Sequence, residues 1–287
     1  MFNKRHIVRT IAATVSILAL SFTAACGSGQ STASNSTDSD DITQQTYKPG
    51  KLTIATGQPA YEPWVMNDKP ESGEGYEAAV AYAVADKLGF KKSDVVWTRT
   101  AFDTAIAPGA KDGDFNIQQF GITDERKKAV DFSSSYYNDS QSVVVKKDSK
   151  FANATKVSDL KDATVGVMVG TLAYDYAKAN IKDDIQTFND DAALAQALDA
   201  GQIDVLVTST VECVYMVQSE QVKDSKVLGR LPDSEDKSGM GIVLPKDSKL
   251  TAAVTKAVDD LNADGTIKKL QDKWLAEYTT DLTELKK

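Results

Sequence analysis

Segments that favour strands alternate with segments that favour helices from residue 50 onward, and this alternation constrains the fold more than any other feature. Helices are predicted over 75–88, which Gly89 follows, and over 191–198, with Asp190 or Asp191 as its N-cap. Apolar residues at helical spacing from 250 to 261 predict another helix. Alternating elements predict an α/β fold with a largely parallel sheet. The predicted strands are 51–56, 95–99, 117–122, 141–146, 164–169 and 203–208.

The charge of the chain excludes some classes of partner. The 287 residues suffice for one large domain or two smaller ones, and the formal net charge is −8. Residues 1–25 contribute three basic residues and no acidic one, so the remainder has 30 basic and 41 acidic residues, a net charge of −11. A chain this acidic lacks the electrostatic footprint of a protein that binds nucleic acid or anionic lipid.

The scarcity of histidine and cysteine excludes several kinds of chemistry. The single histidine, His6, lies within residues 1–25, so the rest of the chain has no histidine for a catalytic triad or a metal site. Cys26 and Cys213 are too few for a thiolate zinc site or a disulfide framework. The neighbours of Cys213 are largely apolar, which predicts a buried, unreactive thiol. The motifs G-x-S-x-G, Walker A and H-E-x-x-H are absent, and we expect no enzyme, cofactor or metal.

The N-terminal segment is typical of an exported protein. Residues 1–9 are basic, residues 10–24 are uncharged, and the apolar run is too short to span a membrane, so 1–25 is predicted to be a signal peptide. Small residues before Cys26 resemble a bacterial lipobox, in which the cysteine receives a lipid, although Thr23 stands where leucine is usual. Residues 26–49 are predicted to be the lipidated cysteine and a flexible tether, because most of them are polar or glycine. An ordinary secreted protein is the alternative.

The segment 118–137 contains the clearest candidate for a ligand contact. Thr123 and Arg126 lie three residues apart, just after an apolar run and beside Gly121. An arginine in this position can hold a carboxylate through two parallel hydrogen bonds, with a threonine hydroxyl and free backbone N–H groups beside it. The alternative is that Arg126 pairs with a nearby acidic residue on the surface, and spacing alone does not decide between the two.

Several motifs, taken in order, resemble the extracytoplasmic solute-binding proteins of ABC importers for polar amino acids. The resemblance extends over about residues 50–280. The matching pieces are Gly75-Tyr76-Glu77, Gly121-Ile122-Thr123-Asp124-Glu125-Arg126 with Asp131-Phe132-Ser133, Gly166 through Gly170-Thr171, Gly201 with Ile203-Asp204, and Asn262-Ala263-Asp264-Gly265-Thr266.

The resemblance implies two α/β lobes joined by two crossing strands, with a small-molecule ligand in the cleft. Lobe 1 would comprise 50–138 with 239–287, and lobe 2 would comprise 139–238. It implies a monomer that closes around an amino acid or a related carboxylate and delivers it to the permease subunits of an ABC transporter. With the lipid on Cys26, the protein would be anchored to the outer face of the cell membrane.

The resemblance also assigns roles to individual residues. Arg126 would hold the ligand's α-carboxylate, assisted by Thr123, the Gly121 backbone and Thr171 from lobe 2. Tyr61 and Phe102 would form aromatic walls, for which ordinary core packing is the alternative, as it is for Trp64. Gln119 or its neighbour Gln118 would hydrogen-bond the ligand.

One position departs from the family. Where the family places an aspartate for the ligand's α-ammonium, this chain has Ser209. Glu212 could replace the missing acid if it turns inward; otherwise the ligand lacks a free amino group. Two other classes stay open, namely an enzyme built on the same fold and a surface lipoprotein without a transport role.

Overall fold

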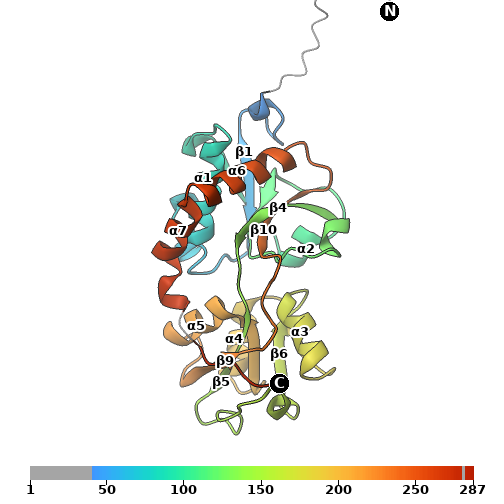
Figure 1. The fold of residues 1–287 in the computed structure, drawn as a ribbon, viewed down its shortest axis with the longest axis vertical. Helices are drawn as coiled ribbons and strands as arrows, with labels where there is room; N and C mark the ends of the chain where they lie inside the picture. The colour runs from blue at the N-terminus through green and yellow to red at the C-terminus, as the bar shows by residue number, and fades with distance from the viewer. Residues whose placement is uncertain (1–40, 280–281) are drawn as a thin grey trace, which may run out of the picture. The chain divides into compact units, whose positions relative to one another are not determined.

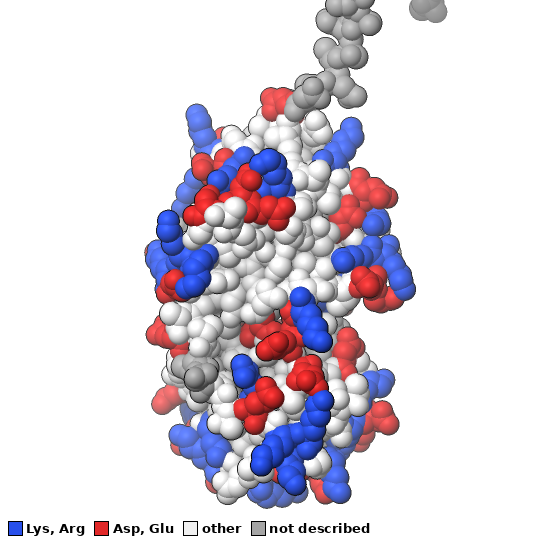
Figure 2. Space-filling view, viewed as in Figure 1, with Lys and Arg blue, Asp and Glu red and all other residues white. Residues whose placement is uncertain are grey.

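The computed structural model describes residues 41–279 and 282–287, which belong to one compact unit containing two five-stranded sheets (Figure 1). Each sheet has its own helices and its own apolar core, so the fold is a two-lobed α/β fold. None of the helices in the described part of the chain has the length and apolar content needed to cross a membrane. On the face seen in Figure 2, acidic and basic side chains are interspersed over both lobes.

The first lobe is built on a sheet with the strand order β2-β1-β3-β10-β4. β1 pairs in parallel with β2 and β3, whereas β10 pairs antiparallel with β3 and β4. The strands are β1 (Leu52–Thr56), β2 (Val95–Arg99), β3 (Phe115–Asn116), β4 (Val130–Tyr137) and β10 (Met240–Pro245). The helices of this lobe are α1 (Tyr76–Lys87), α2 (Phe102–Ile106), α6 (Thr251–Ala263) and α7 (Thr266–Trp274).

The second lobe has a sheet with the order β7-β6-β8-β5-β9. Its parallel strands are β6, β7 and β8, and β5 runs antiparallel to β8 and β9. The strands are β5 (Gln141–Lys146), β6 (Val165–Met168), β7 (Gln186–Phe188), β8 (Val205–Ser209) and β9 (Ser225–Arg230). The helices are α3 (Leu172–Asn180), α4 (Asp191–Asp199) and α5 (Thr210–Gln218).

Short 3₁₀ turns complete the elements. They are η1 (Ile42–Gln44), η2 (Met66–Asp68), η3 (Pro70–Ser72), η4 (Lys92–Asp94), η5 (Arg126–Lys128), η6 (Val157–Leu160) and η7 (Ala276–Tyr278). The chain passes from the first sheet to the second between β4 and β5, and it returns between β9 and β10 (Figure 1). Two extended segments, 138–140 and 231–239, therefore cross between the lobes.

Most of the predicted elements are confirmed. The strands expected at 51–56, 95–99, 141–146 and 164–169 form. All three predicted helices form as well, as α1, α4 and α6, and the buried face of α6 contains Val254, Val258 and Leu261. The sheets are mixed, whereas a largely parallel sheet was expected. The strand predicted over 117–122 is wrong. The regular strand ends at Asn116, because the backbone at Gln119 has φ +48° and turns out of the extended conformation.

The two ends of the predicted domain layout need correction. Residues 41–49, expected to belong to a flexible tether, are folded: Thr46 is buried, and the Tyr47 N–H donates to the Asp114 carboxylate at 2.6 Å. That carboxylate also accepts from the Thr53 N–H, which ties this segment to β1. The predicted signal peptide, and Cys26 with the tether up to residue 40, lie outside the described residues.

The C-terminal residues were assigned to lobe 1, but residues 282–287 pack on the second lobe. The Arg230 N–H donates to the Thr283 carbonyl at 2.9 Å, and the Leu285 N–H donates back to the Arg230 carbonyl at 2.8 Å. The Leu285 side chain is buried in the core of the second lobe. Backbone pairing and apolar burial thus hold the tail beside β9, away from the helices that precede it.

Candidate functional site

A cavity of about 210 Å³ lies between the two lobes and receives residues from both. In the first lobe its wall comes from the loops that follow β1 and β3, and in the second lobe from the loops that follow β6, β7 and β8. These loops leave the carboxyl ends of parallel strands, where open α/β sheets bind their ligands. The volume is below the range typical of drug-sized ligands, so the cavity suits a small metabolite.

Arg126 extends across this cavity from the first lobe to the second. Its Nη1 donates to the Gly121 carbonyl at 2.7 Å, and its Nη2 donates to the Gly170 carbonyl of the second lobe at 2.8 Å. The guanidinium lies 5.6 Å from the centre of the Phe102 ring. Within the described residues no carboxylate forms an ion pair with Arg126, which argues against the alternative of a surface ion pair. Burial lowers the pKa of Arg126, and unused N–H donors remain.

Local structure explains the position of Arg126. The Thr123 hydroxyl accepts from the Arg126 N–H at 3.1 Å and starts the η5 turn that follows. Thr123 therefore caps the turn and is absent from the residues that line the cavity. Phe102, at the start of α2, stacks on Phe120 with 4.7 Å between ring centres and supports the guanidinium from one side.

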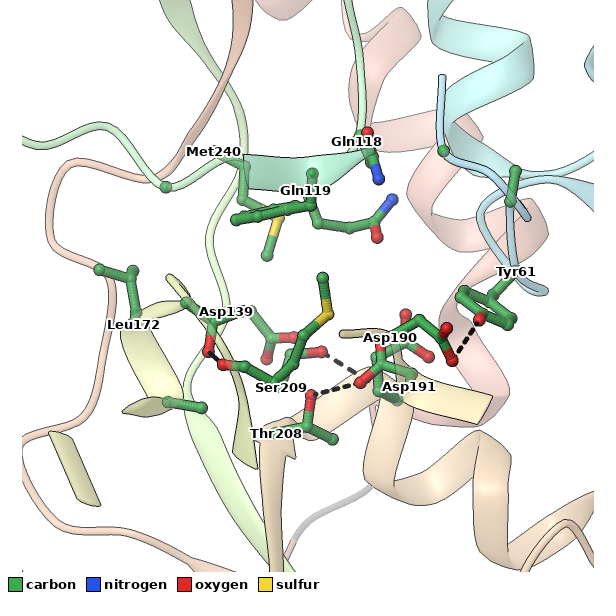
Figure 3. A pocket seen from close by; sticks show the side chains of 18 of the residues that line it. Tyr61, Gln118, Gln119, Asp139, Leu172, Asp190, Asp191, Thr208, Ser209 and Met240 are labelled. Carbon is green, nitrogen blue, oxygen red and sulfur yellow. Dashed lines mark hydrogen bonds between the residues drawn. The ribbon is translucent and has the colours of Figure 1, made fainter. Parts of the chain in front are cut away.

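A buried carboxylate beneath the cavity fixes the position of Gln119. Glu77 accepts a hydrogen bond from the Gln119 N–H at 2.7 Å, and it also accepts from the Gln119 side-chain amide and the Tyr136 hydroxyl. Burial raises the pKa of Glu77 to about 7, while these donors favour its ionised form. Gln118 and Gln119 lie above the cavity, opposite the acidic side chains of the second lobe (Figure 3).

Helix N-termini form the second-lobe wall of the cavity. Thr171 caps α3 by accepting from the Tyr174 N–H at 3.2 Å, and Ser209 caps α5 by accepting from the Glu212 N–H at 3.3 Å. Asp190 caps α4 by accepting from the Ala193 N–H at 2.8 Å. The N-terminal ends of helices carry partial positive charge, which partly compensates for the carboxylates placed there.

Five carboxylates line the cavity, and burial perturbs several of them. Burial raises the pKa of Asp139 to about 6. The pKa of Asp191 is raised to about 6, first by burial and then by the neighbouring Asp190. Burial raises the pKa of Glu212 and, less strongly, that of Asp236. The site is therefore rich in acidic groups whose ionised forms lack full compensation.

Trp64 connects the first lobe to the acidic floor of the cavity, which consists of Asp139, Asp191 and Glu212. Its indole Nε1 donates to Glu212 Oε1 at 2.6 Å, and both side chains are buried. Trp64 thus belongs to the core of the first lobe, as the core-packing alternative stated, while its N–H group also reaches into the second lobe. Tyr61 makes a second connection through its hydroxyl, which lies 3.4 Å from Asp190 Oδ1 (Figure 3).

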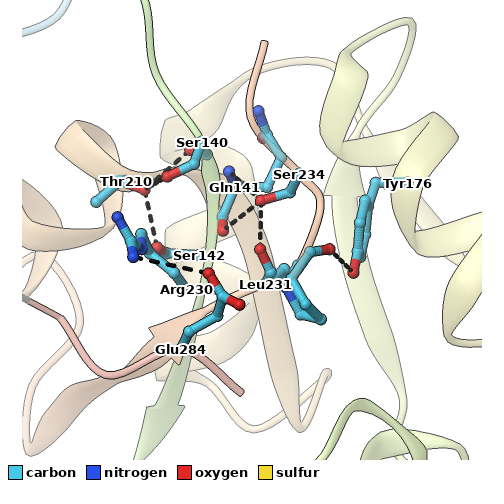
Figure 4. A network of polar contacts seen from close by, with 10 residues as sticks. Ser140, Gln141, Ser142, Tyr176, Thr210, Arg230, Leu231, Ser234 and Glu284 are labelled. Atoms are coloured by element: carbon cyan, nitrogen blue, oxygen red, sulfur yellow. Dashed lines mark hydrogen bonds and ion pairs between the residues drawn. The ribbon is translucent and has the colours of Figure 1, made fainter. Parts of the chain in front are cut away.

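A polar network holds the segment that carries Asp139. The Thr210 hydroxyl lies 2.9 Å from the hydroxyls of both Ser140 and Ser142, and the Gln141 N–H donates to the Ser234 hydroxyl at 3.0 Å (Figure 4). These bonds join the two segments that cross between the lobes to the start of α5. The floor of the cavity is consequently fixed to the second lobe.

Seven of the eight ligand-contact residues named from the sequence line the cavity, and Thr123 is the exception. The seven are Tyr61, Phe102, Gln119, Gly121, Arg126, Thr171 and Ser209. Sequence reasoning missed Asp139, Asp191 and Asp236. Asp191 had a signal, since it adjoins the predicted cap of a helix after a strand; the other two lie in irregular crossing segments and had none. Cys213 is buried, as predicted.

Comparison with known proteins agrees with this geometry. The model of the family described as bacterial extracellular solute-binding proteins, family 3, matches residues 52–277. The L-cystine-binding protein TcyJ of Escherichia coli (strain K12) is 29% identical over 223 residues, covering 77% of this chain and 81% of that protein. The ABC transporter glutamine-binding protein GlnH of Bacillus subtilis (strain 168) is 27% identical over 271 residues, covering 92% and 96%.

A solved structure with a similar fold is that of an ancestral arginine-binding protein bound to arginine. It superposes with a TM-score of 0.67 at 31% identity, covering 78% of this chain and 98% of that chain. The matched region contains both sheets and the loops around the cavity. The chain belongs to the bacterial extracellular solute-binding proteins of family 3.

Proposed function

We propose that this protein captures an amino acid in the cavity between its lobes and delivers it to the permease of an ABC importer. The relatives named above bind L-cystine, glutamine or arginine, and one of them is named as a component of an ABC transporter. The role is that of a receptor that binds its ligand without converting it. The proposal places the chain outside the cell, anchored through a lipid on Cys26.

The observation that carries this proposal is the environment of Arg126. Two backbone carbonyls, one from each lobe, orient its guanidinium in the cavity, and no described carboxylate pairs with it. A bidentate contact with the ligand's α-carboxylate would use the remaining donors. Thr171 and the backbone at the start of α3 would contact the same carboxylate from the second lobe.

The other contacts follow from the placement of the side chains. Tyr61 and Phe102 would enclose the ligand, and Gln119, Gly121 and Ser209 would contribute polar groups. Thr123 would act indirectly by holding the η5 turn. Because Arg126 already touches Gly170 of the second lobe, ligand binding and lobe closure would stabilise each other.

Thermal unfolding in the presence of single amino acids tests the proposal. A ligand at 100 times its dissociation constant adds about 2.7 kcal/mol to the free energy of unfolding, which raises the melting temperature measurably. We expect at least one free amino acid to give this shift and Arg126→Ala to weaken its binding by tenfold or more, since hydrogen bonds to charged groups contribute about 1.5–3 kcal/mol.

Two controls accompany this test. Lys127→Ala removes an exposed cation one position away and should leave binding unchanged. The N-acetylated and decarboxylated forms of the same amino acid report separately on its amino and carboxylate groups. Unchanged affinity in Arg126→Ala, or stabilisation by no amino acid, would contradict the proposal.

A further inference from the structure

We propose that the ligand is an α-amino acid with a cationic side chain, and that the carboxylates of Asp139, Asp191 and Glu212 hold its positively charged groups. This inference rests on the proposed function, since it takes Arg126 as the partner of the ligand's α-carboxylate. The resemblance predicts an acid at the position of Ser209, which is uncharged. The positive charge of the ligand would therefore be bound by these three residues.

The balance of charge around the cavity is the first support. Five carboxylates line it, whereas Arg126 is the one cationic side chain among the described lining residues. Asp190 accepts from the Ala193 N–H and the Tyr61 hydroxyl, and Asp236 lies on the side of Arg126, so the other three carboxylates are left to face a cationic group. Asp139 accepts from backbone N–H groups too, but a carboxylate can accept further bonds. A neutral zwitterion would leave this excess negative charge in place, whereas a cationic side chain reduces it.

A free carboxylate oxygen gives the second support. Glu212 is 4% exposed, and Trp64 donates to its Oε1, but none of the described residues donates to its Oε2. A buried carboxylate oxygen requires a donor, and an ammonium or guanidinium group supplies both donors and charge.

The arrangement of the floor agrees with this role. Asp139 and Asp191 lie across the cavity from the glutamine amides, at the level of Ser209 and Thr208 (Figure 3). Asp191 Oδ1 accepts from the Thr208 hydroxyl at 3.5 Å, and Asp139 accepts from the Ser140 N–H at 2.7 Å.

Calorimetric titration with matched pairs of ligands tests the inference. Citrulline has nearly the shape of arginine but an uncharged urea group, and norleucine is lysine without its side-chain ammonium group. We expect arginine or lysine to bind at least tenfold more tightly than its neutral partner, because one hydrogen-bonded charge contributes that much or more.

The outcomes separate this inference from the proposed function. Tighter binding of citrulline, norleucine or glutamine than of arginine and lysine would overturn the inference that the ligand has a cationic side chain. It would leave the proposed function, amino-acid capture, unaffected. Binding of agmatine, the decarboxylated arginine, as tightly as arginine would support the acidic floor and contradict the role of Arg126. Binding of none of these compounds would overturn both.

Isosteric variants locate the effect. Glu212→Gln keeps an acceptor for Trp64, and Asp139→Asn provides an independent variant if the first does not fold. A variant of the carboxylate that faces the side-chain cation should weaken arginine binding by about tenfold or more and leave citrulline binding nearly unchanged, whereas a variant of one that faces the α-ammonium, which citrulline shares, should weaken both. Asp183→Asn, at an exposed position outside the cavity, is the matched control. Equal losses for arginine and citrulline in both variants would mean that neither carboxylate contacts the side-chain charge, and the inference would be wrong.

Discussion

The hydrogen bond between Trp64 and Glu212 joins the core of one lobe to the floor of the other. Phenylalanine could fill most of the volume of Trp64 but offers no N–H group. The indole therefore does two things, since it packs 5.5 Å from the Tyr137 ring and donates to a buried carboxylate. Removing the donor leaves Glu212 Oε1 buried without a partner.

We expect Trp64→Phe to lower the free energy of unfolding by about 1–3 kcal/mol, the cost of an unsatisfied buried polar group. Denaturant titration measures this loss. Trp97→Phe is the matched control, because Trp97 Nε1 donates to the Tyr82 hydroxyl at 3.1 Å in a part-buried position away from the cavity. A smaller loss in Trp64→Phe than in Trp97→Phe would refute the importance of the contact between the lobes.

At the scale of elements, the C-terminal tail also connects the two lobes. Helix α7 lies on the first lobe, and in the η7 turn the Tyr278 ring already packs against Tyr215 of α5 in the second lobe. Residues 282–287 then pair with β9 and with the segment before η6. The Val157 N–H donates to the Lys286 carbonyl, and the Lys286 N–H donates to the Thr155 carbonyl at 2.9 Å. Leu285 is 4% exposed and anchors this pairing.

Leu285→Ala should destabilise the protein by about 2–5 kcal/mol, as large-to-small substitutions at buried positions do. The free energy of unfolding from denaturant titration measures the effect. Lys287→Ala, which removes only an exposed ion pair with Asp233, should have little effect. If both variants were equally stable, the tail would contribute nothing to the second lobe.

Elements that depend on local pattern could be predicted from the sequence, and those that depend on distant partners could not. The helix over Thr251–Ala263 was predictable because its buried face repeats every three to four residues. The end of β3 depends on Glu77, which is far away in sequence and holds the turn at Gln119. The tail also has no local signal, because its pairing with Arg230 exists only in the folded chain.

The same distinction applies to the site. Arg126 was predictable from its spacing to Thr123 and Gly121 together with the family resemblance, and Thr171 and Ser209 from the resemblance alone; all three line the cavity. Asp139 and Asp236 lie in the crossing segments, where no periodicity marks the side that faces the cavity. Glu212 was considered as a substitute for the missing acid, and its burial beneath Trp64 could not be read from spacing.

At the scale of the whole molecule, the buried carboxylates make stability depend on pH. The pKa of Glu77 is about 7, and those of Asp139 and Asp191 are about 6, above their ordinary values of 4.5 and 3.8. The folded protein therefore binds more protons than the unfolded chain between about pH 4 and pH 7, and its free energy of unfolding falls as pH rises through this interval. Carboxylates with a lowered pKa, such as Asp264, make the free energy of unfolding depend on pH only below this interval.

We expect the ligand-free protein to melt at a higher temperature at pH 5.5 than at pH 7.5, as measured by differential scanning calorimetry. Glu77→Gln should reduce the difference by removing one of the three groups. A saturating cationic ligand should also reduce it, because the ligand favours the ionised carboxylates of the floor. A melting temperature that rises from pH 5.5 to 7.5 in the ligand-free protein would contradict these shifts.

The most direct test of amino-acid capture is a crystal structure of the protein with the amino acid that stabilises it most. We predict the α-carboxylate within hydrogen-bond distance of the Arg126 guanidinium, about 2.7–2.9 Å, and the positively charged groups of the ligand on Asp139, Asp191 or Glu212. An α-carboxylate bound elsewhere in the cavity, with Arg126 still held only by Gly121 and Gly170, would contradict the proposed mode of binding.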